Sequence, residues 1–199
     1  MYIKGMNFVK KISKFFLAFF LLCSSANAEN YAYGGVKIFN YGIETSDLQN
    51  LNTSLIALGF SSAKSETDNT GVGFDIGMGF GIAEGFSVEG GYVNYGTLEI
   101  VTTLTGPSEK LTTEISGDGV TIAGVLDAEG FYVKAGMHSW DFTGTVTASL
   151  GSSSQALGTG TDPFFGIGFS SGNLISSLEH YVIDDGDIQS INLTYRMPF

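Results

Sequence analysis

Residues 71–82 read Gly-Val-Gly-Phe-Asp-Ile-Gly-Met-Gly-Phe-Gly-Ile, and this stretch decides the fold. Its large apolar residues all share one parity, while the other parity holds five glycines and Asp75. A period of two predicts a β-strand. A soluble sandwich turns apolar residues inward and polar ones outward, with few glycines. Here one face of the strand has almost no side chains, which fits the crowded interior of a small barrel. The opposite, apolar face of the strand would then contact lipid.

The same alternation recurs along the chain and predicts eight strands. We expect them near residues 31–39, 71–82, 86–96, 118–126, 131–142, 163–170, 174–183 and 187–199. An even number of antiparallel strands is typical of bacterial outer-membrane barrels. The expected fold class is therefore all-β, an eight-stranded antiparallel transmembrane β-barrel of the up-and-down type.

The connections between these strands are expected to alternate in length. Short turns are predicted at residues 83–85, 127–130, 171–173 and 184–187. Longer connections are predicted near residues 40–70, 97–117 and 143–162. Short turns on one side of the membrane and mostly long loops on the other are the layout of outer-membrane barrels.

The first long connection contains a helical pattern. Leucines recur three and four residues apart over residues 46–59, which predicts a short amphipathic helix capped by Ser46 and Asp47. We expect its apolar side to pack on the barrel rim or to enter the lipid.

Residues 1–28 differ in composition from the remainder and predict a secretory signal peptide. A basic start, a short apolar run and an A-x-A cleavage site follow one another at residues 4–14, 15–22 and 26–28. The apolar run is too short to cross a bilayer as a helix. We expect cleavage after Ala28, so that residues 29–199 form the barrel domain.

Composition and charge exclude several classes of protein. With 13% aromatic residues and 15% charged ones the chain is not typical of disorder. One cysteine excludes a disulfide framework. After cleavage, five basic side chains would remain against 20 acidic ones, a net charge of −15. Nucleic-acid binding is excluded because it needs Lys and Arg opposite phosphates.

Seven charged or titratable residues share the small-residue parity and are expected inside the barrel as a polar network: Lys37, Asp75, Glu89, Lys134, His138, Glu179 and Arg196. Apart from the histidine, they carry three positive and three negative charges. Unpaired charges in a narrow lumen cost several kcal/mol each, so a balanced set is expected. We expect Arg196 to pair with Glu179 or Glu89, with Lys134 as the other partner for Glu179. The net −15 would then lie in loops and turns.

No catalytic, metal or cofactor site is predicted. A serine hydrolase needs a serine beside a histidine, and that histidine needs an orienting carboxylate. His138 and Ser139 are adjacent, so they point to opposite faces of a strand. His180 falls on the lipid-facing parity. The acidic residues at 184–187 lack the ligand spacing of a calcium loop and are typical of a hairpin turn.

The last strand carries a further pattern. Its outward parity holds Ile191, Leu193, Tyr195, Met197 and Phe199. In this strand, and over residues 131–141 and 173–196, the chain resembles the small outer-membrane β-barrels, OmpA-like and OmpX-like. The resemblance implies that these five residues form an assembly signal, read by the barrel-assembly machinery, and that the protein lies in the bacterial outer membrane.

We therefore predict a non-enzymatic outer-membrane barrel with a structural or cell-surface role, in envelope integrity or surface interaction. Three alternatives stay open: a narrow gated pore for small solutes or ions, an adhesin acting through residues 97–117 and 143–162, and a lipid-A-modifying enzyme. Expected partners are outer-membrane lipid and glycolipid and the export and barrel-assembly machinery. We expect a monomer that binds neither nucleic acid nor a cofactor.

Overall fold

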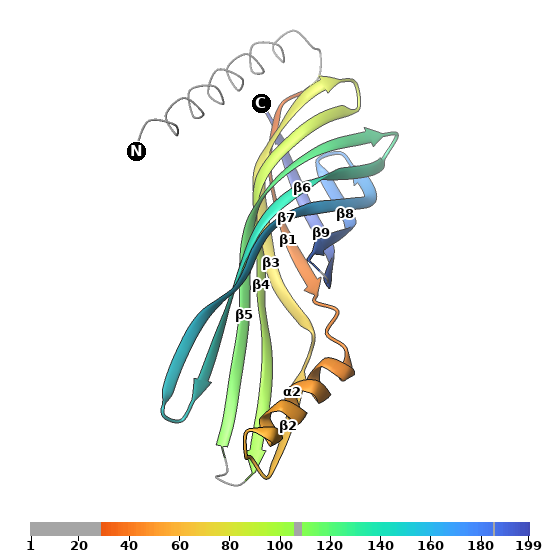
Figure 1. The fold of residues 1–199 in the computed structure, drawn as a ribbon. Helices are drawn as coiled ribbons and strands as arrows, with labels where there is room; N and C mark the ends of the chain where they lie inside the picture. Colours follow the sequence, from red (N-terminus) through yellow and green to blue (C-terminus); the bar gives the residue numbers. More distant parts are fainter. Residues whose placement is uncertain (1–28, 106–108, 185) are drawn as a thin grey trace, which may run out of the picture.

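The computed structural model describes residues 29–105, 109–184 and 186–199, so the signal-peptide prediction for residues 1–28 lies outside it. Long strands form a tall barrel in this part of the chain (Figure 1). The elements are β1 (Tyr31–Asn40), α2 (Thr45–Ala57), β2 (Ser62–Thr67), β3 (Thr70–Ala83), β4 (Phe86–Thr105), β5 (Glu109–Ala128), β6 (Phe131–Ala148), β7 (Gly151–Ser171), β8 (Leu174–Ile183) and β9 (Gly186–Pro198).

Eight of these strands close a ring. The hydrogen-bonded order is β4-β3-β1-β9-β8-β7-β6-β5, and β5 pairs with β4 again. Every pairing is antiparallel, including the closing pair of the first and last strands, where Tyr33 lies opposite Arg196. β2 pairs with the far end of β4, which places Ser62 opposite Thr105. The predicted eight-stranded antiparallel barrel is confirmed.

Two hairpins are longer than the sequence analysis predicted. β4 pairs with β5 as far as Leu104 opposite Glu109, and β6 pairs with β7 as far as Ala148 opposite Gly151, so both ladders continue into the connections that we expected to be long, β-rich loops. The threonines of the first hairpin favour strands. In β4 the alternation continues, with Leu98 and Ile100 buried, whereas β7 is mostly small or polar here and shows no apolar alternation.

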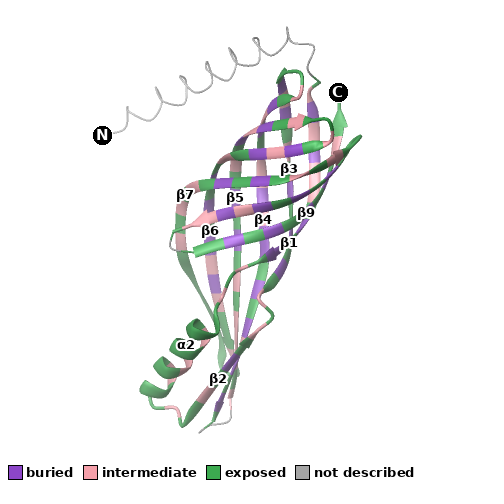
Figure 2. Cartoon of the chain, turned by 90° about the vertical axis from the view of Figure 1, so that its right-hand side faces the viewer, coloured by how far each residue is buried: buried purple, intermediate pink, exposed green. Residues whose placement is uncertain are grey.

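Helix α2 confirms the predicted helix, with a different cap. The N-cap is Glu44, whose backbone N–H donates to Asp47 Oδ2 at 3.0 Å while its own side chain accepts from the Asp47 backbone. This capping box replaces the cap that we expected from Ser46 and Asp47. The helix packs against β2 beyond the barrel, rather than on the rim or in lipid (Figure 2). In the described ranges, no helix has the length and apolar character needed to cross a membrane.

Strand residues alternate between buried and exposed around the barrel (Figure 2). In β3, Val72 is 72% exposed whereas Asp75 is 5% exposed. Large apolar side chains of this outer face follow one another across the strands as an apolar belt that includes Ile38, Val72, Ile76, Ile122, Ile167, Leu178 and Ile191. Water-soluble proteins rarely expose continuous apolar patches of this extent. The belt is the surface that meets the hydrocarbon core of the bilayer.

Candidate functional site: a filled lumen and a protruding sheet

Lys37 stands at the centre of a buried ion cluster. Its Nζ lies 3.1 Å from Asp75 Oδ2 and 2.7 Å from Glu179 Oε2. The same ammonium donates to the Tyr181 hydroxyl at 3.3 Å, and that hydroxyl donates to Glu179. All four side chains are buried because β1, β3 and β8 turn these residues inward. One ammonium group thus contacts two carboxylates.

Glu89 anchors a second cluster, nearer the chain termini. Lys134 Nζ lies 2.8 Å from Glu89 Oε2, and Arg196 Nη2 lies 3.5 Å from Glu89 Oε1. The Tyr31 hydroxyl donates to the same carboxylate at 2.7 Å. Arg196 Nη1 reaches Asp127 Oδ2 at 2.7 Å. The Arg196 guanidinium also lies over the Tyr31 ring, 4.5 Å from its centroid.

The structure brings the seven network residues of the sequence analysis inside the barrel wall, in pairs that differ partly from those expected. Arg196 meets Glu89, but Glu179 meets Lys37 instead of Arg196 or Lys134. The register explains this, because Glu179 lies opposite Ser190, six residues from Arg196 on β9. Six strand residues span about 20 Å.

Asp127 is a site residue that the sequence analysis missed. We assigned it to a turn outside the lumen, yet it ends β5 with its carboxylate on Arg196. The expectation that all of the excess negative charge lies outside the lumen is therefore wrong. The run Asp127-Ala128-Glu129-Gly130 is typical of a turn, so we ended the strand at residue 126 and missed the pairing.

Aromatic side chains fill the lumen on the other side of the Lys37 cluster. This aromatic layer consists of Phe39, Tyr95, Trp140, Phe142, Phe164 and Tyr181, all buried. Tyr181 stacks on Phe164 with ring centroids 5.1 Å apart and meets the Tyr95 ring edge-on at 5.5 Å. The charged clusters and the aromatic layer together occupy the interior, as expected for a barrel of eight strands.

The two histidines have structural contacts. His138 Nε2 donates to the Val182 carbonyl at 2.8 Å, which leaves Nδ1 to accept from the Tyr95 hydroxyl at 2.5 Å. His180 lies on the outer wall, 3.4 Å from Asp187 Oδ1 and packed on the Phe165 ring. Neither arrangement provides the serine that a hydrolase would need. Among the residues with described positions, no group of three or more metal-ligating side chains forms a site.

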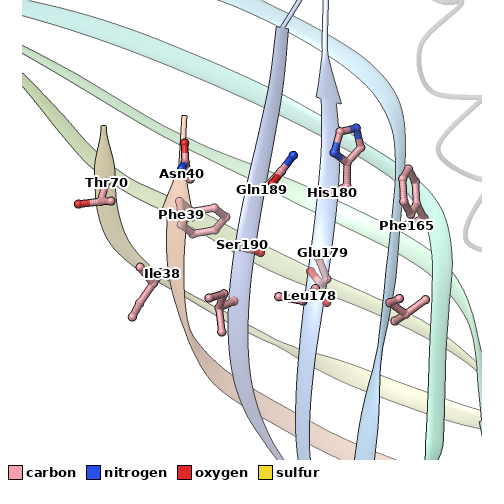
Figure 3. A pocket seen from close by; sticks show the side chains of 12 residues that line it. Ile38, Phe39, Asn40, Thr70, Phe165, Leu178, Glu179, His180, Gln189 and Ser190 are labelled. Carbon is pink, nitrogen blue, oxygen red and sulfur yellow. The ribbon is translucent and has the colours of Figure 1, made fainter. Parts of the chain in front are cut away.

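A groove of about 510 Å³ crosses the outer wall over β3, β1, β9, β8 and β7 (Figure 3). One row of side chains along this groove is apolar, with Ile38 opposite Ile191 on the neighbouring strand. The next row toward the long hairpins is mostly polar, with Asn40 opposite Gln189 and His180 beside it. The change from apolar to polar side chains indicates the outer boundary of the apolar belt.

Beyond this boundary β2, β4, β5, β6 and β7 continue as a protruding sheet, which carries α2 at its end (Figure 1). β7 pairs with β6 along this extension, but its ladder with β8 begins only at Phe164. The other edge of β7 is therefore open over residues 151–162. Residues 151–161 contain no charged side chain. Sequence reasoning missed this edge because Ser, Gly and Thr dominate it and show no apolar alternation.

Among its described residues, the protruding sheet has one ion pair. Lys64 of β2 forms an ion pair with Glu66, and both side chains are exposed. The hydrogen bond between them raises the pKa of Lys64 and lowers the pKa of Glu66. At the base of the sheet, burial raises the pKa of Tyr41 to about 12. Its hydroxyl therefore stays protonated and donates to the Tyr95 carbonyl at 2.6 Å.

Comparison with solved structures finds barrels of the same kind. Ail, the attachment invasion locus protein of Yersinia pestis, solved with the heparin analogue sucrose octasulfate, aligns with a TM-score of 0.51 and 15% identity, covering 85% of this chain and 99% of Ail. OprG from Pseudomonas aeruginosa aligns with a TM-score of 0.43 and 9% identity, covering 85% of this chain and 96% of OprG. Neisserial surface protein A aligns with a TM-score of 0.41 and 14% identity, covering 84% of this chain and 97% of that protein. No protein-family model and no curated protein matches the chain. The likeness to Ail concerns the fold.

Proposed function

We propose that this chain, an eight-stranded outer-membrane β-barrel, acts at the cell surface by binding an extended segment of a partner protein along the open edge of β7. The observation that carries the proposal is the protruding sheet, whose edge at residues 151–162 has unpaired backbone groups. Such an edge accepts a further strand through main-chain hydrogen bonds.

The composition of this edge supports the proposal. Proteins usually protect free edges with lysine, proline or inward-pointing charges. Residues 151–161 contain none of these, and Asp162 and Pro163 come only where the barrel begins. The long ladder with β6 carries the edge away from the barrel (Figure 1). An adhesive or otherwise surface-binding role fits this edge better than transport does, because buried side chains fill the lumen.

The remaining partners are proposals of the same kind. The apolar belt and the polar row beside Asn40 would contact the acyl chains and headgroups of outer-membrane lipid and glycolipid. The export and barrel-assembly machinery would handle the chain before it folds, the latter reading the alternating last strand up to Phe199. The closed ring needs no second copy to satisfy its strand edges, which supports a monomer.

The edge proposal is tested with two matched double variants. Ser152→Lys with Ser154→Lys protects the open edge of β7, whereas Thr145→Lys with Thr147→Lys adds the same charge to β6, which is paired on both sides. A random peptide library is selected against the wild-type protein in lipid nanodiscs. We expect peptides that bind the wild type and the β6 variant but not the β7 variant. Peptides that bind all three proteins equally, or an empty selection, contradict the proposal.

Binding of sulfated polyanions, by contrast, is not expected. Ail was solved with sucrose octasulfate, but this chain has few cations to offer such a ligand. Lys37, Lys134 and Arg196 lie in the lumen and the exposed Lys64 is paired with Glu66, so that the exposed Lys110 is the one other basic side chain of residues 29–199. We expect no heat of binding for sucrose octasulfate in calorimetry at about 150 mM salt, where longer-range attraction is screened. A dissociation constant below about 1 mM would show that the charge argument is wrong.

A further inference from the structure

A second cavity, of about 290 Å³, opens at the outer mouth of the barrel; we call it the mouth cup. Its floor is the top of the aromatic layer, formed by Trp140 and Phe142. Its walls come from the first connection, the two long hairpins and the short β8–β9 hairpin, and include Ile43, Leu157 and Ile183. The mouth cup is therefore an apolar surface outside the bilayer that faces water.

The cup is held in shape by contacts beneath it. Trp140 Nε1 donates to Asp162 Oδ2 at 2.7 Å, which fixes the plane of the indole ring. Tyr41, which also lines the cup, is fixed by its hydrogen bond to the Tyr95 carbonyl. The volume is close to the lower end of the range for small-molecule sites. A preformed apolar cavity of this size favours a compact apolar ligand, because little ordering is needed on binding.

The charges around the cup determine which ligand fits. Asp184 and Asp187 of the β8–β9 hairpin line it, although the Asp187 carboxylate lies 3.4 Å from His180 Nε2 on the outer wall, and the described lining contains neither Lys nor Arg. Trp140 and Phe142 of the floor are aromatic, and aromatic rings attract cations. Residues 29–199 carry 20 acidic and five basic side chains, so the surrounding field also favours a cation.

We propose that the mouth cup binds a small organic cation, an apolar body that carries one ammonium group. The apolar body would lie on Trp140 and against Leu157, and the ammonium group would lie beside the carboxylate of Asp184. This binding goes beyond strand addition: the cup would bind its ligand through side chains, whereas strand addition would use the main-chain groups of β7, and Leu157 and Gly158 belong to both regions.

Trp140 allows a direct test because it is the single tryptophan of the chain. The protein in lipid nanodiscs is titrated with 4-phenylbutylamine while the tryptophan emission is recorded. The controls are 4-phenylbutanol and 4-phenylbutyrate, which keep the apolar body but carry no charge or a negative one. We expect saturable binding of the amine, weaker binding of the alcohol and none of the carboxylate. Equal responses to all three, or a linear response from uptake into the bilayer, overturn the proposal.

Two kinds of variant locate the site. Asp184→Asn should weaken amine binding about tenfold and leave alcohol binding unchanged. Glu84→Gln makes the same change in charge at the opposite end of the barrel and should have no effect. Gly158 lines the cup, and a Cβ atom there would lie 3.4 Å from the Trp140 ring, in ordinary contact. Gly158→Leu should therefore fill the cup and abolish binding of both ligands; unchanged binding would exclude the cup as the site.

Discussion

Replacing Lys37 by methionine should destabilise the barrel by about 3–5 kcal/mol, the cost of leaving buried charges without a partner. Methionine keeps much of the side-chain volume but removes the ammonium group between Asp75 and Glu179. The Tyr181 hydroxyl would still donate to Glu179, but Asp75 would keep no ion-pair partner among the described contacts. The measurement is the urea midpoint of unfolding in lipid vesicles.

The control for this variant is Lys64→Met. Lys64 also forms an ion pair with a glutamate, but both side chains of that pair are largely exposed. Exposed pairs contribute little because water already solvates both charges. The midpoint of Lys64→Met should therefore match that of the wild type. Equal midpoints for Lys37→Met and Lys64→Met would show that the Lys37 cluster does not hold the barrel together.

The loss of stability caused by Lys37→Met should also depend on pH. In the variant, two carboxylates lie close together without a cation, so the folded state takes up a proton more readily than the unfolded chain does. Where the folded state binds more protons, stability rises as the pH falls. The difference between wild type and variant should therefore narrow from pH 7 toward pH 4. A constant difference would mean that the variant loses packing rather than charge balance.

The sequence predicted the barrel because lipid and lumen impose opposite demands on alternate residues. Every membrane-spanning strand must carry apolar residues on its lipid-facing side. Val72 and Ile76 therefore identify β3 from the sequence alone, without knowledge of the strands that it pairs with. The same demand predicted that Lys37 and Glu179 point inward. The alternation of inward and outward residues, however, does not show how far along the barrel axis a side chain lies. The pairing of Glu179 with Lys37 follows from the register of β1, β9 and β8, which a single strand pattern cannot provide.

The protruding sheet could not be predicted for the complementary reason. The extended part of β4 still alternates, with Leu98, Ile100 and Leu104 buried, but β7 is mostly small or polar and exposed over residues 151–162, so residues 143–162 resemble a loop. The mouth cup was missed because its parts come from distant segments. Ile43, Trp140 and Asp184 lie in three different connections or strands, and only the closure of the ring brings them together.

Gly79→Leu should destabilise the barrel about as much as Lys37→Met, but through a packing clash instead of a loss of charge. Gly79 is a buried position of β3 on the glycine parity, and a Cβ atom there would overlap the Tyr31 ring. A leucine would therefore displace this ring and break the hydrogen bond that its hydroxyl donates to Glu89 and the one that it accepts from Ser87. Overpacking alone costs about 1–3 kcal/mol, and the lost hydrogen bond to a charged group adds about 1.5–3 kcal/mol.

Gly90→Leu is the matched control. Gly90 lies on β4 opposite Met78, one position from the pair of Gly79 with Glu89, but it faces outward. A Cβ atom there meets its nearest atom, the Thr121 carbonyl oxygen, at 3.9 Å. The added side chain would extend into lipid, which suits an apolar residue. Folding of both variants into vesicles is followed by the shift of the unheated protein on SDS gels. We expect a folded band for Gly90→Leu and a large loss of it for Gly79→Leu. Because the two substitutions are identical and adjacent, equal folding would refute the explanation that the glycine face exists to make room for Tyr31 and its neighbours inside the barrel.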